Sequence, residues 1–145
     1  MDTRRIARAL ARRHNTRNPF RIMEEMDFVV VFAPLAGVRG FSQRFARRKI
    51  VCVSDALDER EAQFVGAHEL GHIMLHGDLN RVFLDTRTFF PTSRYEREAD
   101  RFAVDLIFDD DDLMDYLDFS LPDVAAALGV SLELAEYRMS GIKTV

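Results

Sequence analysis

The chain has 145 residues, 48% of them hydrophobic and 30% charged, with a formal net charge of −4. This length is typical of one domain, and we predict a single domain over residues 1–145. The composition excludes a disulfide framework, because Cys52 is the only cysteine. It also excludes a membrane helix, because no apolar run approaches the roughly 20 residues that such a helix needs. The basic N-terminus lacks the apolar stretch of a secretory signal, so we expect a cytoplasmic protein.

The charge is unevenly distributed along the chain. Residues 1–50 contain 12 Lys/Arg and 4 Asp/Glu, a net charge of +8, whereas residues 51–145 contain 8 and 20, a net charge of −12. A basic half could bind an acidic partner or nucleic acid. No nucleic-acid-binding motif accompanies it, so we favour the alternative that the two halves attract each other within one folded unit.

The first 55 residues predict two helices and then a small sheet. Residues 1–13 have the apolar spacing of an amphipathic helix, and Pro19 suits the first turn of a short helix that runs to about Met26. Three segments rich in β-branched or aromatic residues then predict strands. These strands span about 28–32, 38–45 and 49–53, with Arg47 and Arg48 at a hairpin tip between the last two. We expect the first strand to be buried and the three-stranded sheet to be antiparallel.

The rest of the chain predicts helices. The expected segments are a helix over 58–76, an irregular segment over 78–93, a helix over 94–108, an acidic run at 109–112 and a C-terminal helical pair over 121–140. Asp58, with Glu61 three residues later, resembles a capping box at the start of the first of these helices. Pro91 acts as a helix breaker in the irregular segment. This order of helices, small sheet and further helices predicts an α+β domain with about five to six helices.

The helix over 58–76 carries the pattern H-E-x-x-H, as His68-Glu69-Leu70-Gly71-His72. A spacing of four residues places both imidazoles on one side of the helix, close enough to share one metal ion. Zinc favours such nitrogen ligands, and Glu69 could act beside it as a general base that later passes the proton to the leaving amine. The alternative is a pair of structural histidines. Gly71 is unusual inside a helix, and it suggests close packing around an active site.

A third metal ligand is expected on the helix over 94–108, where Glu96 and Glu98 are the candidates. Glu96 falls about 50° from the centre of the buried stripe, and Glu98 falls about 110° away on the other side, nearer solvent. We therefore favour Glu96. Asp100, one turn later, could hold the second nitrogen of a ligand histidine. An acidic helix start that balances the dipole is the alternative. Three protein ligands plus water describe a catalytic zinc site rather than a structural one.

Two further residues are candidates for auxiliary roles near this site. His76 continues the spacing of four but drifts around the helix, so we favour capping or packing over metal binding. Tyr95 could donate a hydrogen bond to a developing oxyanion, as could His76 or Arg94, although a surface tyrosine is the simpler interpretation. The acidic run at 109–112 lacks the spacing of a calcium loop, so we interpret it as a solvated turn.

These motifs resemble those of the ImmA/IrrE family of small gluzincin-like metallopeptidases. The resemblance spans roughly residues 18–140. Its specific parts are HELGHIMLH at 68–76 and EREADRFA at 96–103, and looser matches lie at 18–20, 37–41 and 130–131. One departure is Asp100, where such proteins often have Asn. Another is the exit of the ligand helix into the acidic run, where such proteins often have an apolar run and proline.

The resemblance implies a minimal gluzincin-like zinc-peptidase domain. One zinc ion would be held by His68, His72 and Glu96, and Glu69 would be catalytic. Members of the family act in phages, mobile elements and stress responses, where they inactivate a helix-turn-helix repressor, often by cleaving it. The resemblance therefore implies a protein substrate of that class and relief of repression as the outcome.

The C-terminal pair over 121–140 itself resembles a helix-turn-helix. Its second helix carries Glu133, Glu136 and Arg138 instead of the basic and amide groups that read DNA. We therefore expect no direct nucleic-acid binding. Because no apolar run is long enough to span a membrane, we expect no membrane partner either. Besides a peptidase, two alternatives stay open. One is a non-proteolytic, zinc-stabilised regulator that binds a repressor or other partner, and the other is a DNA-binding regulator that uses the C-terminal helices.

Overall fold

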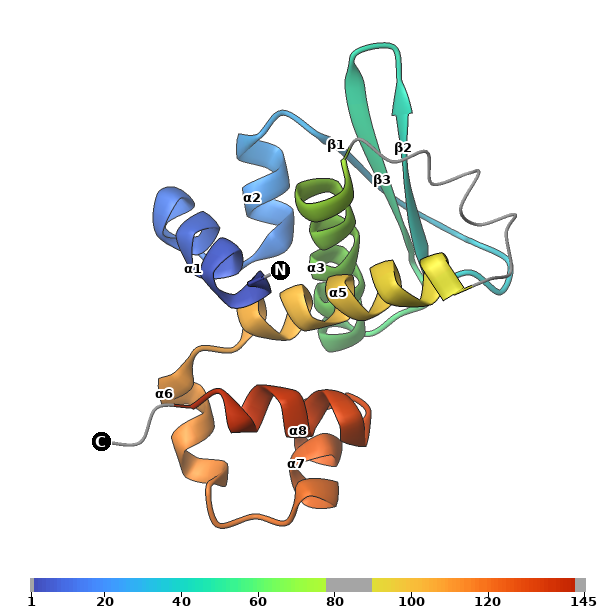
Figure 1. Cartoon of the computed structure of the whole chain (residues 1–145). Coiled ribbons are helices and arrows are strands. Elements are labelled where there is room, and N and C mark those ends of the chain that lie inside the picture. Colours follow the sequence, from blue (N-terminus) through green and yellow to red (C-terminus); the bar gives the residue numbers. More distant parts are fainter. Residues whose placement is uncertain (1, 78–89, 143–145) are drawn as a thin grey trace.

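The computed structural model describes residues 2–77 and 90–142, and it confirms the predicted α+β class (Figure 1). Most of residues 78–93, where we predicted irregular structure, lies outside the described ranges. The elements are α1 (Thr3–His14), α2 (Pro19–Glu25), β1 (Val29–Ala33), β2 (Gly40–Phe45), β3 (Arg48–Ser54), α3 (Glu59–His76), α5 (Phe90–Ile107), α6 (Asp110–Leu113), the 3₁₀ turn η1 (Met114–Tyr116), α7 (Leu121–Leu128) and α8 (Leu132–Ser140). Within the described ranges, no helix is both long enough and apolar enough to cross a membrane.

The three strands form a mixed sheet in the order β1-β3-β2. β2 and β3 are antiparallel, with Gly40 opposite Val53, as expected of a hairpin. β1 runs parallel to β3, with Val29 opposite Ile50, so the prediction of an all-antiparallel sheet is wrong. Neighbouring strands lie about 4.8 Å apart, and the six residues 34–39 are long enough to pass the end of one intervening strand. β3 can therefore occupy the central position.

The central strand is buried, whereas the first strand lies at an edge of the sheet. Val51 and Val53 of β3 are fully buried, but Val31 and Phe32 of β1 are 38% and 53% exposed. The prediction of a buried strand over 28–32 is therefore wrong. A run of β-branched and aromatic residues suits central and edge strands alike. Only the order of the strands, which depends on long-range pairing, decides which strand is left at the edge.

Helix α3 begins and ends where the sequence predicts. The Asp58 carboxylate accepts a hydrogen bond from the backbone N–H of Glu61 at 2.8 Å and so caps the first turn. The helix ends at His76, directly before Gly77. It contacts β2 and β3 on one side and α5 on another. Helix α3, which carries the H-E-x-x-H pattern, is thus held against both the sheet and a second long helix, α5 (Figure 1).

Helix α5 crosses α3 closely at Gly71. A Cβ atom at Gly71 would lie 3.0 Å from Cδ1 and 3.2 Å from Cβ of Phe102. A side chain at this position would therefore require the Phe102 side chain to shift by a few tenths of an ångström, and the close packing predicted at Gly71 is confirmed. α5 begins at Phe90, so the prediction of irregular structure is wrong for residues 90–93. Pro91 lies in the first helical turn, where its missing N–H leaves no helical hydrogen bond unmade.

The acidic run at 109–112 is the capped start of α6. Asp109 and Asp112 form a capping box, in which each side chain accepts a hydrogen bond from the other's backbone N–H. Arg8 of α1 pairs with Asp110 at 2.9 Å, and Arg17 pairs with Asp112. The predicted attraction between the basic and acidic halves is present here. The run is the paired start of a helix, so its interpretation as a turn is wrong, whereas Asp111 and Asp112 are exposed to solvent as expected.

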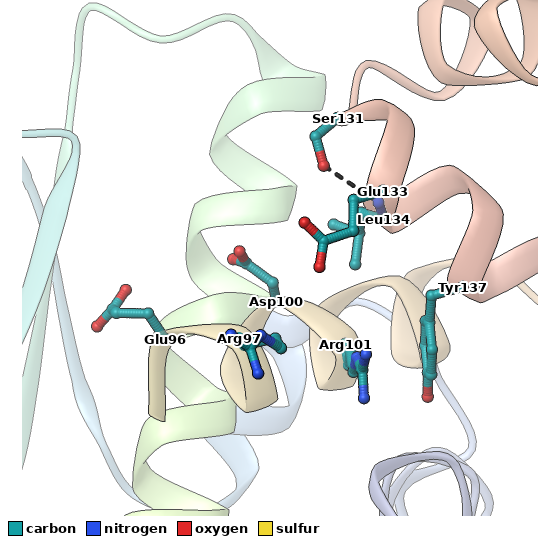
Figure 2. A pocket seen from close by; sticks show the side chains of 8 residues that line it. All are labelled: Glu96, Arg97, Asp100, Arg101, Ser131, Glu133, Leu134 and Tyr137. Carbon is teal, nitrogen blue, oxygen red and sulfur yellow. Dashed lines mark hydrogen bonds between the residues drawn. The ribbon is translucent and has the colours of Figure 1, made fainter. Parts of the chain in front are cut away.

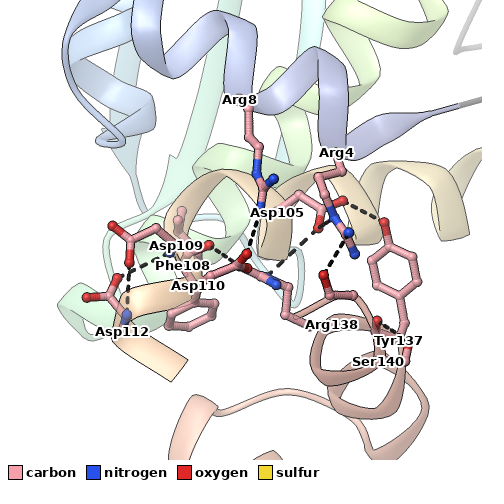
Figure 3. Close-up of polar contacts among 12 residues, drawn as sticks. Arg4, Arg8, Asp105, Phe108, Asp109, Asp110, Asp112, Tyr137, Arg138 and Ser140 are labelled. Carbon is pink, nitrogen blue, oxygen red and sulfur yellow. Dashed lines mark hydrogen bonds and ion pairs between the residues drawn. The ribbon is translucent and has the colours of Figure 1, made fainter. Parts of the chain in front are cut away.

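A buried polar network lies where α1, α5, α6 and α8 meet (Figure 3). The fully buried carboxylate of Asp105 accepts hydrogen bonds from Thr3 Oγ1 at 2.9 Å and from the Tyr137 hydroxyl at 2.6 Å. Arg138, whose side chain is 1% exposed, donates to Asp110 at 2.9 Å and lies 3.9 Å from Asp105. The network links the apolar cluster around α3 and α5 to a second apolar cluster in the C-terminal helices.

Candidate metal centre

Three side chains from α3 and α5 converge on one point. His68 and His72 lie one turn apart on α3, and Glu96 reaches them from α5. His68 Nε2 lies 2.9 Å from Glu96 Oε2, and His72 Nε2 lies 2.8 Å from Glu96 Oε1. The two Nε2 atoms are 3.1 Å apart. Among the described residues, these three offer ligand atoms within 4.8 Å of one another.

The spacing of these atoms fits a small divalent cation. Zinc binds histidine nitrogen and carboxylate oxygen at about 2.0–2.2 Å, so tetrahedral ligand atoms lie about 3.3 Å from one another. The observed separations, from 2.8 to 3.1 Å, would have to widen only slightly. Two imidazoles and one carboxylate form a donor set that suits zinc. The arrangement could therefore hold a metal ion by three protein ligands.

The charges of the metal-free centre are set by these contacts. Burial by itself lowers the pKa of His68, but hydrogen bonds to Asp100 and Glu96 and the charge of Glu69 outweigh it and raise this pKa to about 9. Burial by itself raises the pKa of Glu96, but hydrogen bonds from His68 and His72 outweigh it and hold this pKa well below its usual range. With no cation bound, His68 therefore carries a proton at neutral pH, and a metal ion that binds its Nε2 would have to displace that proton.

Asp100 lies behind His68, as the sequence analysis anticipated. Its Oδ1 is 2.8 Å from Nδ1 of His68. An ionised carboxylate can only accept a hydrogen bond, so the hydrogen on this side of the ring belongs to Nδ1. That arrangement leaves Nε2 directed toward Glu96 and available as a ligand atom.

Glu69 lies between the two histidines in the sequence and is buried, with 3% of its surface exposed. Its negative charge acts on His68, where it contributes to the raised pKa. Glu69 is not one of the three residues whose ligand atoms converge. A buried carboxylate beside such a cluster is suited to proton transfer.

The other two sequence candidates, His76 and Tyr95, pack against each other at the far side of His72. Nδ1 of His76 lies 3.2 Å from Nδ1 of His72, and the His76 and Tyr95 ring centroids are 4.6 Å apart. Glu98 Oε1 lies 3.5 Å from His76 Nε2. The Glu98 side chain is 15% exposed and that of Glu96 is 42% exposed, so the prediction that Glu98 lies nearer solvent is wrong. That helical-wheel estimate ignored α3, whose last turn packs against this side of α5.

Within the described part of the chain, one hollow lies on each side of the centre. One of about 290 Å³ lies between α5 and α8, and Figure 2 shows Glu96 at one end and Tyr137 at the other. The second, of about 470 Å³, lies between the β2–β3 hairpin and the ends of α3 and α5. It is lined by charged and aromatic residues that include Arg44, Lys49, His76, Arg94 and Tyr95. Sequence reasoning did not identify either hollow, because each is formed by elements that are distant in the chain.

Comparison with known proteins identifies the family. The model of a peptidase family, described as the IrrE N-terminal-like domain, matches residues 23–140. The chain belongs to this family. The ImmA/IrrE assignment made from the motifs is thus confirmed, and the centre described above belongs to an IrrE-like peptidase domain.

Two relatives of this IrrE-like chain cover most of its length. An uncharacterised immunity region protein 2 of Bacillus phage phi105 is 34% identical over 132 residues, which cover 89% of this chain and 84% of that protein. The metallopeptidase ImmA of Bacillus subtilis strain 168 is 27% identical over 135 residues, which cover 89% of this chain and 79% of ImmA. Membership of a peptidase family implies a protein substrate, and the metallopeptidase relative indicates that a metal takes part.

Proposed function

We propose that the chain is a zinc-dependent peptidase whose metal is held by His68, His72 and Glu96. The observation that carries the proposal is the convergence of two imidazole nitrogens and one carboxylate within 4.8 Å, on two helices that pack closely at Gly71. Three protein ligands leave a coordination position for substrate or water, which is the arrangement of catalytic rather than structural zinc sites.

Each side chain then has a distinct chemical task. Bound zinc would supply Lewis-acid activation of the peptide carbonyl. Glu69 would accept the proton of the attacking water and later return it to the leaving amine. Asp100 would hold His68 in the tautomer that offers Nε2. Tyr95 could donate to the developing oxyanion, although its ring packs on His76, so we assign it no required role.

The substrate that we propose is a helix-turn-helix repressor, whose inactivation would release the genes of a phage or other mobile element, or stress genes. The family resemblance supports this substrate, as does the relative whose name assigns it to a phage immunity region. A repressor bound to DNA is a cytoplasmic target, and we place the chain in the same compartment. We further propose that residues 1–145 act as one metallopeptidase domain.

Metal content of the purified protein tests the centre itself. We expect about one zinc per chain in the wild type and loss of that zinc in Glu96→Gln, because the amide loses the charge that a bound cation requires. Glu136→Gln, at an exposed position on α8, is the matched control and should keep its zinc. A wild type that takes up no zinc when the metal is supplied would contradict the proposal, as would a Glu96→Gln variant with unchanged content.

Zinc affinity should depend steeply on pH. His68 in the metal-free protein has a pKa of about 9, so binding below that pH displaces one proton, and the apparent Kd should tighten about tenfold per pH unit as pH rises toward 9. Because this pKa lies above the usual value of 6.5 for histidine, protonated His68 also stabilises the metal-free protein against unfolding. That contribution to the unfolding free energy is fully present below about pH 6.5 and is lost as pH rises through about 9. Chelator competition between pH 6.5 and 9 measures the slope. Asp100→Asn should flatten it, and a pH-independent affinity in the wild type would contradict this prediction.

A further inference from the structure

His76 occupies a position that the proposed chemistry does not use. It lies one turn beyond His72 on α3 and is buried, with 4% of its surface exposed. His72 presents Nε2 to Glu96 at 2.8 Å on one side of its ring and Nδ1 to His76 Nδ1 at 3.2 Å on the other. His76 therefore touches the candidate ligand from the side opposite the metal centre.

The hydrogen on each ring follows from this arrangement if His72 binds the metal. A ligand that binds through Nε2 keeps its hydrogen on Nδ1. Nδ1–H of His72 then donates to Nδ1 of His76, which must accept, so the hydrogen of His76 is on Nε2. That nitrogen lies 3.5 Å from Oε1 of Glu98. The order of contacts is thus His72, His76 and then a carboxylate on α5.

We propose that His76 and Glu98 are positioning residues that hold His72 in the tautomer and orientation needed to bind zinc. The inference rests on the proposed function, because it concerns a ligand of that metal. It assigns the two ligand histidines different supports. His68 is held directly by Asp100 at 2.8 Å, whereas His72 is held through a second imidazole whose far nitrogen faces Glu98.

Packing around His76 fixes its ring in place. The Tyr95 ring lies against it, with centroids 4.6 Å apart and planes at 64°, and Glu98 also pairs with Arg94 at 3.6 Å. His72 is itself 3% exposed, so water has little access to its Nδ1–H. Without the acceptor at His76, that donor would be buried and unsatisfied, or the ring would rotate away from its ligand geometry. Either change weakens metal binding without removing a ligand.

The test compares two substitutions at His76 that differ in one acceptor atom. His76→Phe keeps a ring against Tyr95 but removes the acceptor, whereas the amide oxygen of His76→Asn can take the place of Nδ1. We expect His76→Phe to weaken zinc binding about 10- to 100-fold and His76→Asn to recover most of this loss. Glu98→Gln should weaken binding by a smaller factor. Zinc Kd, measured by chelator competition at one pH, is the readout, together with the unfolding free energy of each metal-free variant.

The controls separate this inference from the proposed function. His14→Phe removes a partly buried histidine at the end of α1 that pairs with Glu25 of α2, and it should leave zinc affinity unchanged. Equal zinc affinity in wild type, His76→Phe and Glu98→Gln would overturn the inference while leaving the three-ligand site intact. If His76→Phe does not fold, the zinc affinities of His76→Asn and Glu98→Gln test the inference instead. Unchanged zinc affinity in Glu98→Gln would then contradict it. A wild type that binds no zinc overturns both proposals.

Discussion

Substitution of Glu69 by Gln is expected to abolish peptide-bond cleavage and to leave zinc binding intact. Gln has the shape of Glu but cannot accept a proton, and loss of a general base lowers the rate by about 10²- to 10⁴-fold. Glu69 is buried beside His68 but is not one of the converging ligands, so the metal content should match that of the wild type. The measurement is the appearance of cleaved protein, followed by mass spectrometry, with a helix-turn-helix repressor as the proposed substrate.

Glu59→Gln provides the matched control for this experiment. Glu59 lies on the same helix but is exposed in its first turn, so its substitution should leave cleavage unchanged. If Glu69→Gln still relieves repression as well as the wild type does, the peptidase proposal fails and a zinc-stabilised binding protein replaces it. If the chain alone shifts DNA in a salt-dependent manner, the DNA-binding alternative gains support instead.

Local signals in the sequence were sufficient to place the long helix of the candidate centre. Asp58 and Gly77 bracket α3, and the structure begins the helix at Glu59 and ends it at His76. The spacing of His68 and His72 follows from helical geometry alone, which is why both Nε2 atoms meet at 3.1 Å. Such features depend on neighbours within a few residues, and sequence patterns describe those neighbours well.

Features that depend on long-range packing could not be predicted in the same way. The parallel pairing of β1 with β3 requires a choice between strand orders that the composition of residues 28–32 does not encode. The burial of Glu98 depends on His76 arriving from another helix. The choice of Glu96 over Glu98 as a ligand candidate agrees with the observed convergence, although the exposure on which it partly relied was wrong.

The buried network around Asp105 and Arg138 is the largest feature that sequence reasoning missed. A signal was present, because Asp105 interrupts the apolar run from Phe102 to Ile107 on α5. A lone carboxylate in such a run needs a partner, since burying an unpaired charge is costly. The partners come from α1 and α8, which are more than 30 residues away in the chain. The sequence could therefore indicate that Asp105 needs a partner, but it could not identify which residues supply one.

Removal of Arg138 is therefore expected to be among the most destabilising single changes in the chain. Its side chain is 1% exposed, and it lies between Asp110 at 2.9 Å and the fully buried Asp105 at 3.9 Å (Figure 3). Arg138→Met keeps most of the aliphatic stem but removes the charge, so Asp105 would retain Arg4, at 3.8 Å, as its remaining cation in the network. Breaking a buried pair in this way costs about 3–5 kcal/mol of unfolding free energy. Urea denaturation of the metal-free protein measures the loss.

A second substitution tests whether the unpaired charge of Asp105 causes that loss of unfolding free energy. Burial already raises the pKa of Asp105, against the hydrogen bonds from Tyr137 and Thr3 and the charges of Arg138 and Arg4. Removing Arg138 should raise this pKa further, so the deficit should shrink as pH falls and Asp105 becomes protonated. Adding Asp105→Asn to Arg138→Met should recover part of the loss at neutral pH, whereas simple loss of packing would not be recovered. Arg5→Met, at an exposed position on α1, should change stability by no more than about 0.5 kcal/mol.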